Sequence, residues 1–144
     1  MFTRILVPTD GSDITVKAAH TAIDLAKRLD ARLFIVGVKE PFPYSAIFEI
    51  QPRPPQELYD AQERIASARV KALADLAEAA GVPHSGHTVE ALHPWEAILE
   101  MAKQKGCDLI VMASHGRRGM AALLIGSETS RVLTHSPLPV LVVK

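Results

Sequence analysis

Hydrophobic and polar positions follow two patterns that alternate along the chain. Short apolar runs, typical of strands buried on both faces, occur at Arg4–Val7, Leu33–Val38, Leu109–Ala113 and Val140–Val143. A weaker alternating pattern near His87–Leu92 predicts one more strand. Between these runs, apolar residues recur every three or four positions, which predicts helices. The chain is therefore expected to alternate strands with helices.

Capping and breaking residues mark where the predicted helices begin and end. Ser12 or Asp13 is a suitable N-cap, Gly81 ends a long periodic segment, and Pro94 and Gly106 enclose another. The predicted helices span residues 12–29, 56–80 and 94–106, and a short one ends before Pro137. Residues 39–55 contain five prolines and are predicted to form a long loop.

Strands that alternate with helices favour parallel pairing through right-handed crossovers. At 144 residues the chain has the size of one domain, residues 1–144. It is expected to be α/β, a three-layer open sheet of five parallel strands with about four helices. The most apolar strands, near residues 5–7 and 109–112, are expected at its centre, and the strand near residues 88–92 at an edge. The last strand, Val140–Val143, is as apolar as a central strand, so pairing with a second copy is expected to cover it.

Composition and charge restrict the class of protein. Sixteen basic residues balance sixteen acidic ones, so no net charge draws the chain toward nucleic acid or an acidic membrane. No apolar stretch reaches the roughly 20 residues that span a bilayer. Cys107 is the single cysteine and cannot form an internal disulfide, and residues 1–7 do not resemble a secretory leader. A cytoplasmic protein without nucleic-acid or membrane partners is expected.

Two loops carry candidate chemistry, because ligands of open α/β sheets bind beyond the carboxyl ends of the strands. One loop follows the first strand, at residues 8–12, and the other follows the fourth strand, at residues 113–127. Gly116 and Gly119 permit a positive φ, and Gly126 with Ser127 leads into a helix. Two interpretations are open: a glycine-jointed loop with Ser127 as an ordinary N-cap, or a phosphate cup. The cup would use Ser127 Oγ, the amides of Glu128 and Thr129, the Thr129 hydroxyl, and Arg117 or Arg118.

Neither loop matches the common nucleotide motifs, since the chain has no Walker A sequence and no G-x-G-x-x-G after the first strand. Asp10, His115 and Arg117 are candidates for a base and a clamp, but their spacing does not require catalysis, and no catalytic residue is predicted.

Several other polar residues are expected to have no binding role. His84, His87 and His93 lack the further ligands of a zinc site and are expected to be solvated. Cys107 is expected to be buried, and Glu128 is expected to face solvent.

The segments ILVPTDGSD and MASHGRRGMAALLIGSETSRVLTHSPLPVLVVK resemble the universal stress protein family, and the resemblance extends over the whole chain. Nucleotide-binding members of that family carry glycine, two residues, glycine, nine residues, and then glycine with serine or threonine. Gly116 and Gly126-Ser127 match the last two elements in spacing. The first glycine is replaced by Ala113.

The resemblance implies an adenine-nucleotide alpha-hydrolase-like fold with strand order 3-2-1-4-5. It implies a homodimeric switch or adaptor in stress responses that binds ATP with Mg²⁺, pairs through Val140–Val143 and acts on unidentified protein partners. A nucleotide-independent, chaperone-like adaptor dimer and a slow ATPase or autophosphorylating enzyme are the alternatives. Pro8, Thr9, Asp10 and Val38 would border the adenine, Met112 and Ala113 the ribose, and Ser114, His115, Gly116, Arg117, Arg118, Gly119, Gly126, Ser127, Glu128 and Thr129 the phosphates.

Overall fold

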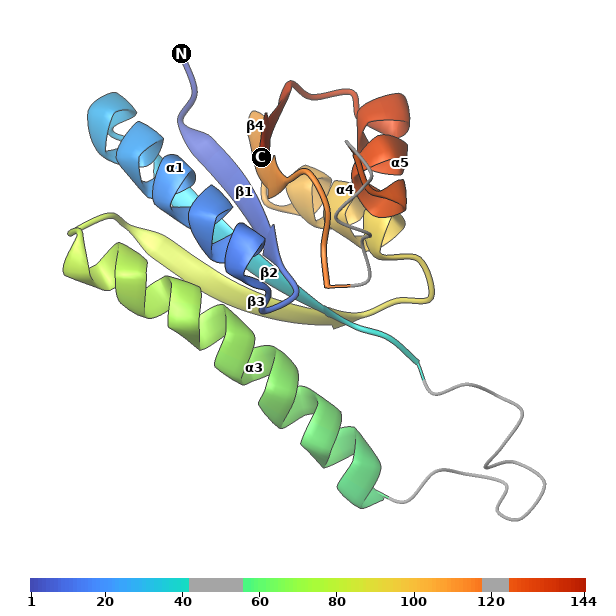
Figure 1. Ribbon diagram of the computed structural model, residues 1–144. Coiled ribbons are helices and arrows are strands. Elements are labelled where there is room, and N and C mark those ends of the chain that lie inside the picture. Colours follow the sequence, from blue (N-terminus) through green and yellow to red (C-terminus); the bar gives the residue numbers. More distant parts are fainter. Residues whose placement is uncertain (42–55, 118–124) are drawn as a thin grey trace.

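The computed structural model describes residues 1–41, 56–117 and 125–144 of the chain. Five strands and four helices alternate along these residues (Figure 1). The strands are β1 (Arg4–Thr9), β2 (Arg32–Lys39), β3 (His84–Glu90), β4 (Leu109–Ala113) and β5 (Val140–Val143). The helices are α1 (Asp13–Leu29), α3 (Gln56–Ala79), α4 (Pro94–Gln104) and α5 (Ser127–His135). Most of the predicted loop at residues 39–55 lies outside the described residues.

All strand pairs are parallel, and the order β3-β2-β1-β4-β5 confirms the predicted topology. β1 and β4 lie inside the sheet, whereas β3 and β5 form its edges. Successive strands are added to one side of β1 as far as β3 and to its other side from β4 onward, so the loops that follow β1 and β4 meet between these two strands.

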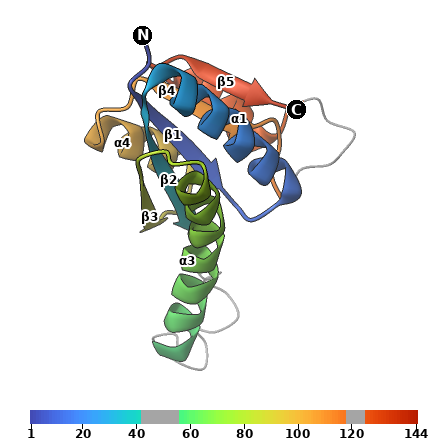
Figure 2. The same ribbon diagram turned by 90° about the vertical axis from the view of Figure 1, so that its left-hand side faces the viewer.

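Helices cover both faces of the sheet and give the three layers expected (Figures 1 and 2). One apolar cluster includes Ile5, Leu33 and Leu73, where α1 and α3 pack on the sheet. A second cluster includes Leu6 and Ile98, on the face covered by α4 and α5. Because successive residues of a strand point to opposite faces, adjacent residues of β1 enter different clusters.

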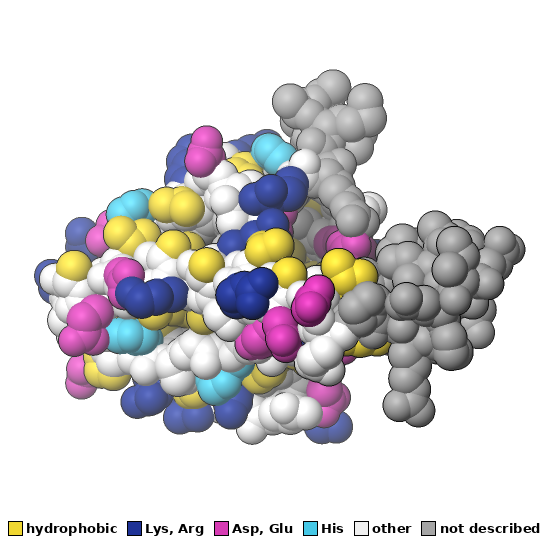
Figure 3. Space-filling view, turned by 90° about the horizontal axis from the view of Figure 1, so that it is seen from below, with side chains coloured by type: hydrophobic (Ala, Val, Ile, Leu, Met, Phe, Trp, Pro, Cys, Tyr) yellow, Lys and Arg dark blue, Asp and Glu magenta, His cyan; other side chains and the backbone are white. Residues whose placement is uncertain are grey.

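α3 lies very close to β2 and β3. A Cβ atom added to Gly86 would lie 2.6 Å from Val70 Cγ1, and one added to Gly37 would lie 2.9 Å from Val70 Cγ2. Both glycines therefore allow the Val70 side chain to fit between helix and sheet. The N-terminal end of α3, near Gln56, extends past the sheet (Figure 2). The surface seen in Figure 3 carries acidic and basic side chains next to one another.

β3 differs from the prediction, because it spans His84–Glu90 and not residues 87–92. Its ladder with β2 begins at the pair Leu33 and His84 and ends at Lys39 and Glu90. Main-chain pairing with β2 determines these bounds, and the polar start of β3 is tolerated because the strand lies at an edge. Within the described part of the chain, no helix combines the length and apolar character needed to cross a bilayer.

Candidate functional site

Asp10 connects the two loops that follow β1 and β4. One carboxylate oxygen, Oδ1, accepts a hydrogen bond from the Ser12 amide at 2.9 Å and another from the Ser12 hydroxyl. The other oxygen, Oδ2, accepts the main-chain N–H of Arg117. The two predicted loops are thus held together by one side chain, although their residues are about a hundred positions apart in the sequence.

Position 116 requires glycine because the Asp10 carboxylate leaves no room for a side chain. A Cβ atom at this position would overlap Oδ2 of Asp10. The positive-φ glycines in the described residues are Gly11, Gly81 and Gly106, so the left-handed conformation considered for Gly116 is not adopted. Close approach of the β4–α5 loop to Asp10 explains this glycine.

The hydrogen bonds around Asp10 favour its ionised form. Burial opposes ionisation, but the Ser12 and Arg117 donors and the Arg117 charge outweigh it and hold the pKa of Asp10 below its ordinary value. The carboxylate therefore stabilises the folded chain only while it is charged.

Replacing Asp10 with asparagine is expected to make the free energy of unfolding less dependent on pH in the acidic range. Because the folded-state pKa is depressed, the stabilisation is present above the ordinary aspartate pKa and is lost as the pH falls below about 4. Asp10→Asn is expected to lower the free energy of unfolding by about 1–2 kcal/mol at pH 7. Urea denaturation at pH 7 and pH 3 checks this, and a difference between the two proteins that stays constant with pH contradicts it.

The start of α5 packs against the same loop. Gly126 is the N-cap of the helix and donates its amide to the carbonyl oxygen of Ser114 at 2.7 Å. Ser127 is exposed and is the first residue of the helix, one position after the N-cap. The interpretation of Ser127 as an ordinary N-cap is therefore wrong. Ser127 belongs to the first turn of α5, whose first amides have no partners within the helix.

Thr129 and Ala113 have structural roles behind this helix end. The Thr129 hydroxyl donates to the main-chain oxygen of Ala113 at 2.8 Å, and Thr129 is only 3% exposed. This differs from the prediction that the Thr129 hydroxyl contacts phosphate, because its hydrogen is bound to the main chain. Ala113 is extended and pairs with Val143 in the sheet, so alanine is accommodated without strain where the family pattern has glycine.

Glu128 does not simply face solvent. Its Oε2 atom accepts the main-chain N–H of Trp95 at 2.9 Å, in the first turn of α4. Arg131 lies 3.9 Å from its other oxygen. The carboxylate is thus directed toward the start of α4, where the helix dipole favours a negative charge, and it does not block the amides at the start of α5.

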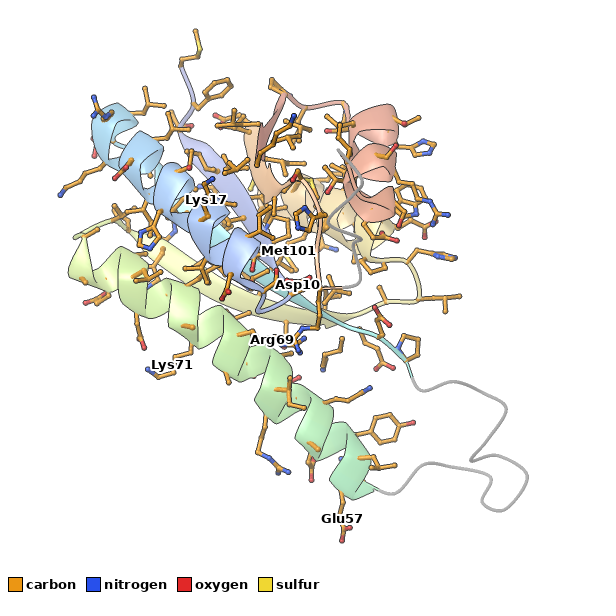
Figure 4. The ribbon with its side chains drawn as sticks, in the orientation of Figure 1. Asp10, Lys17, Glu57, Arg69, Lys71 and Met101 are labelled. Carbon is orange, nitrogen blue, oxygen red and sulfur yellow. The ribbon has the colours of Figure 1, made fainter. Side chains whose placement is uncertain are left out.

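A groove of about 710 Å³ runs between the first turns of α1 and the β4–α5 loop. It is lined by Gly11, Ser12, Asp13, Ile14, Lys17, His115, Gly116, Arg117 and Lys144. Lys17 and Arg117 bring positive charge to it. Figure 4 shows Asp10 at the end of β1 and Lys17 farther along α1.

Sequence reasoning missed Ile14, Lys17 and Arg69. The methylene groups and Nε of Arg69 lie within 3 Å of the position that a Cβ of Gly11 would occupy, so Arg69 reaches from α3 to the β1–α1 turn (Figure 4). No local signal marks Arg69, because its neighbour is 58 positions away in the chain. Lys17 lies one turn after the predicted start of the helix. Helical spacing therefore places it near the β1–α1 turn, which is a weaker indication in the sequence.

The remaining predicted residues lie at different depths. Pro8 and Thr9 are buried at the end of β1, and Thr9 Oγ1 accepts the Gly11 amide at 3.1 Å. Val38 is half-buried near the end of β2, and Met112 is buried in the core. Arg118 and Gly119 lie outside the described residues.

The histidines differ in part from the expectation. His84 and His87 are half-buried, whereas His93 is exposed. Among the described residues, no group of three or more acidic, histidine or cysteine side chains is placed to hold a metal ion. Cys107 is buried as expected, and burial raises the pKa of its thiol to about 11, so it is protonated at neutral pH.

Known proteins share both the sequence and the fold. The model of the universal stress protein family matches residues 1–144. Universal stress protein MJ0531 of Methanocaldococcus jannaschii is 35% identical over 100% of this chain and 83% of its own length. Universal stress protein UspA from Lactobacillus plantarum is 27% identical, with a TM-score of 0.84 over 99% of this chain and 98% of its own. A universal stress protein solved in complex with cAMP is 28% identical, with a TM-score of 0.74 over 99% of this chain and 97% of its own.

Proposed function

Since the chain belongs to the universal stress protein family, we propose that it binds ATP with Mg²⁺ and acts as a homodimeric switch or adaptor in stress responses. One observation carries the nucleotide proposal: the exposed Ser127 hydroxyl and the first amides of α5 lie beside the loop that Asp10 holds to the end of β1. This arrangement offers donors for phosphate beyond the carboxyl ends of β1 and β4, the position where ligands of α/β proteins bind. The cAMP complex of a similar protein supports an adenine nucleotide.

The phosphates are assigned to the start of α5. The Arg117 amide already donates to Asp10, so the anion would use Ser127 Oγ and the amides of Ser127 and Glu128. Glu128 favours this assignment because its carboxylate is bound to the Trp95 amide. Arg117, in the loop that packs against the start of α5, brings a positive side chain to the neighbouring groove, whereas Lys17 Nζ donates to the main-chain oxygen of Lys144.

The residues present also fit a magnesium ion that is bound mainly by phosphate. Mg²⁺ usually keeps several waters and takes one or two protein carboxylates together with nucleotide phosphates. Asp13 is exposed and lines the groove, whereas Asp10 is held by Ser12 and Arg117. Asp13 is therefore the carboxylate that would contact the ion.

ATP binding is tested with two serine variants of α5. Titration calorimetry with Mg²⁺ and ATP is expected to show binding to the unmodified protein and about tenfold or weaker affinity for Ser127→Ala, because a hydrogen bond to a charged phosphate is lost. Ser130→Ala is the control, since Ser130 is exposed on the same helix one turn later. Its affinity is expected to stay unchanged.

Each other outcome points to a different function. No binding at millimolar ATP overturns the nucleotide proposal and favours a nucleotide-independent adaptor dimer. Turnover of ATP that requires Mg²⁺ and disappears in Ser127→Ala favours a slow ATPase.

The dimer is assigned to β5. This strand is an edge of the sheet, and its outer side has no strand partner among the described residues. Leu141, in this strand, is 38% exposed. Pairing with β5 of a second copy would satisfy the free main-chain groups and cover Leu141.

A further inference from the structure

A basic cluster lies at the opposite end of the sheet, where the N-terminus is located (Figure 1). It consists of Arg4, Arg32 and His87, which contact the ring of Phe34, and of Lys105, whose charge acts on His87. The guanidinium carbon of Arg4 lies 4.5 Å from the ring centroid and that of Arg32 lies 5.7 Å from it. The His87 ring stacks on Phe34 with a centroid separation of 6.4 Å. β1, β2, β3 and the C-terminal end of α4 thus each contribute one positive or protonatable side chain to this end of the sheet.

The cations of this cluster are held by neutral groups. Arg4 Nε donates to the carbonyl oxygen of Lys105 at 2.7 Å, and Arg32 Nη2 donates to that of His84 at 3.3 Å. Among the described residues, no carboxylate lies within ion-pair distance of Arg4, Arg32 or Lys105. The nearby Asp108 accepts main-chain amides at the start of β1. The aromatic ring and the carbonyl groups therefore position the two guanidinium groups without neutralising them.

His87 responds to this positive field. Burial and the charges of Lys105 and Arg32 hold its pKa below the ordinary value. Its Nε2 atom lies 2.9 Å from Ser85 Oγ, and its other neighbour is the Phe34 ring, so no acidic group faces it among the contacts of the described residues.

We propose that this basic cluster is a second anion site, which binds the two phosphate groups of a diphosphate or of a longer linear phosphate chain. Guanidinium groups match phosphate oxygens in a bidentate geometry, and both arginines keep N–H groups that are not used in the hydrogen bonds described above. Because these side chains are already fixed by Phe34 and the carbonyl groups, little ordering is needed on binding. Several separate cations favour an anion with more than one charged group.

The test uses inorganic pyrophosphate as the probe, with binding followed by NMR of the main-chain amides and of the His87 ring. We expect saturable shifts at residues of the basic cluster and a rise in the pKa of His87, because a bound anion offsets the charges of Lys105 and Arg32. Arg32→Ala is expected to weaken binding about tenfold or more. Arg32 is exposed, so this variant is expected to fold.

Two control variants make the result specific. Arg64→Ala removes an exposed arginine of α3 outside the cluster, and Ser127→Ala alters the proposed nucleotide site. Both are expected to bind pyrophosphate at the cluster as the unmodified protein does. Absence of saturable shifts, or equal weakening by Arg32→Ala and Arg64→Ala, would show only non-specific attraction and overturn the proposal. Failure of ATP binding leaves this result unaffected, because the two sites lie at opposite ends of the strands.

Discussion

The Gly126→Val protein is expected to show no measurable ATP binding and a free energy of unfolding lower by about 1–3 kcal/mol. Even a single Cβ at Gly126 would lie 3.1 Å from His115 Cα and 3.3 Å from His115 Cβ. The two further methyl groups of valine must push α5 away from the β4–α5 loop. This movement separates Ser127 from the loop and lengthens the hydrogen bond from the Gly126 amide to Ser114.

The measurement combines calorimetric ATP titration with urea denaturation, at a temperature where circular dichroism shows the variant to be folded. Ser130→Val is the matched control, because it places the same side chain at an exposed position of α5. Its ATP affinity is expected to equal that of the unmodified protein. A folded Gly126→Val protein that binds ATP normally would exclude the start of α5 as the phosphate site.

Replacing Leu141 with glutamate is expected to convert the proposed dimer into monomers. In a two-fold interface each copy contributes the same residue, so the substitution places two carboxylates in one interface. Burying unpaired charges costs several kcal/mol, and a weakening of the dimer by at least about a hundredfold is expected. The main-chain pairing of β5 with β4 does not involve the side chain, so each copy is expected to remain folded.

Sedimentation equilibrium over a range of protein concentrations measures this change. Leu92→Glu is the control, because Leu92 is 71% exposed and follows β3 at the other edge of the sheet. It is expected to remain a dimer. Monomers of the unmodified protein at all concentrations, or a Leu141→Glu protein that still dimerises, would refute an interface at β5.

Most of the fold follows from local patterns in the sequence. The central strands are uniformly apolar and the helices have clear ends, so their positions were predictable from these patterns. The patterns also placed two strands at the centre and one at an edge, whereas the full strand order came from the resemblance to the family. β3 was misplaced by a few residues because its start, HSGH, is polar and its bounds depend on pairing with β2. An edge strand is only partly buried, so its residues need not be apolar, and a pattern of apolar residues does not locate its ends.

The candidate site was predictable as two loops but not as a set of contacts. The bond from Arg117 to Asp10 joins residues 107 positions apart, and the bond from Trp95 to Glu128 joins residues 33 positions apart. Neither pairing has a local signature, because it depends on how closely separate loops and helices approach in the folded chain. The same reason explains why the glycine at position 116 was attributed to backbone freedom, whereas it provides space for a carboxylate.

Two hydrogen bonds join the start of α5 to the edge strand. The Gly126 amide donates to Ser114 O at 2.7 Å, and the Ser114 amide donates to Val143 O at 2.8 Å. If ATP binds at one end of this connection and a second copy pairs at the other, thermodynamic linkage makes any coupling reciprocal: the factor by which ATP tightens self-association equals the factor by which self-association tightens ATP binding. The apparent ATP affinity would then vary with protein concentration.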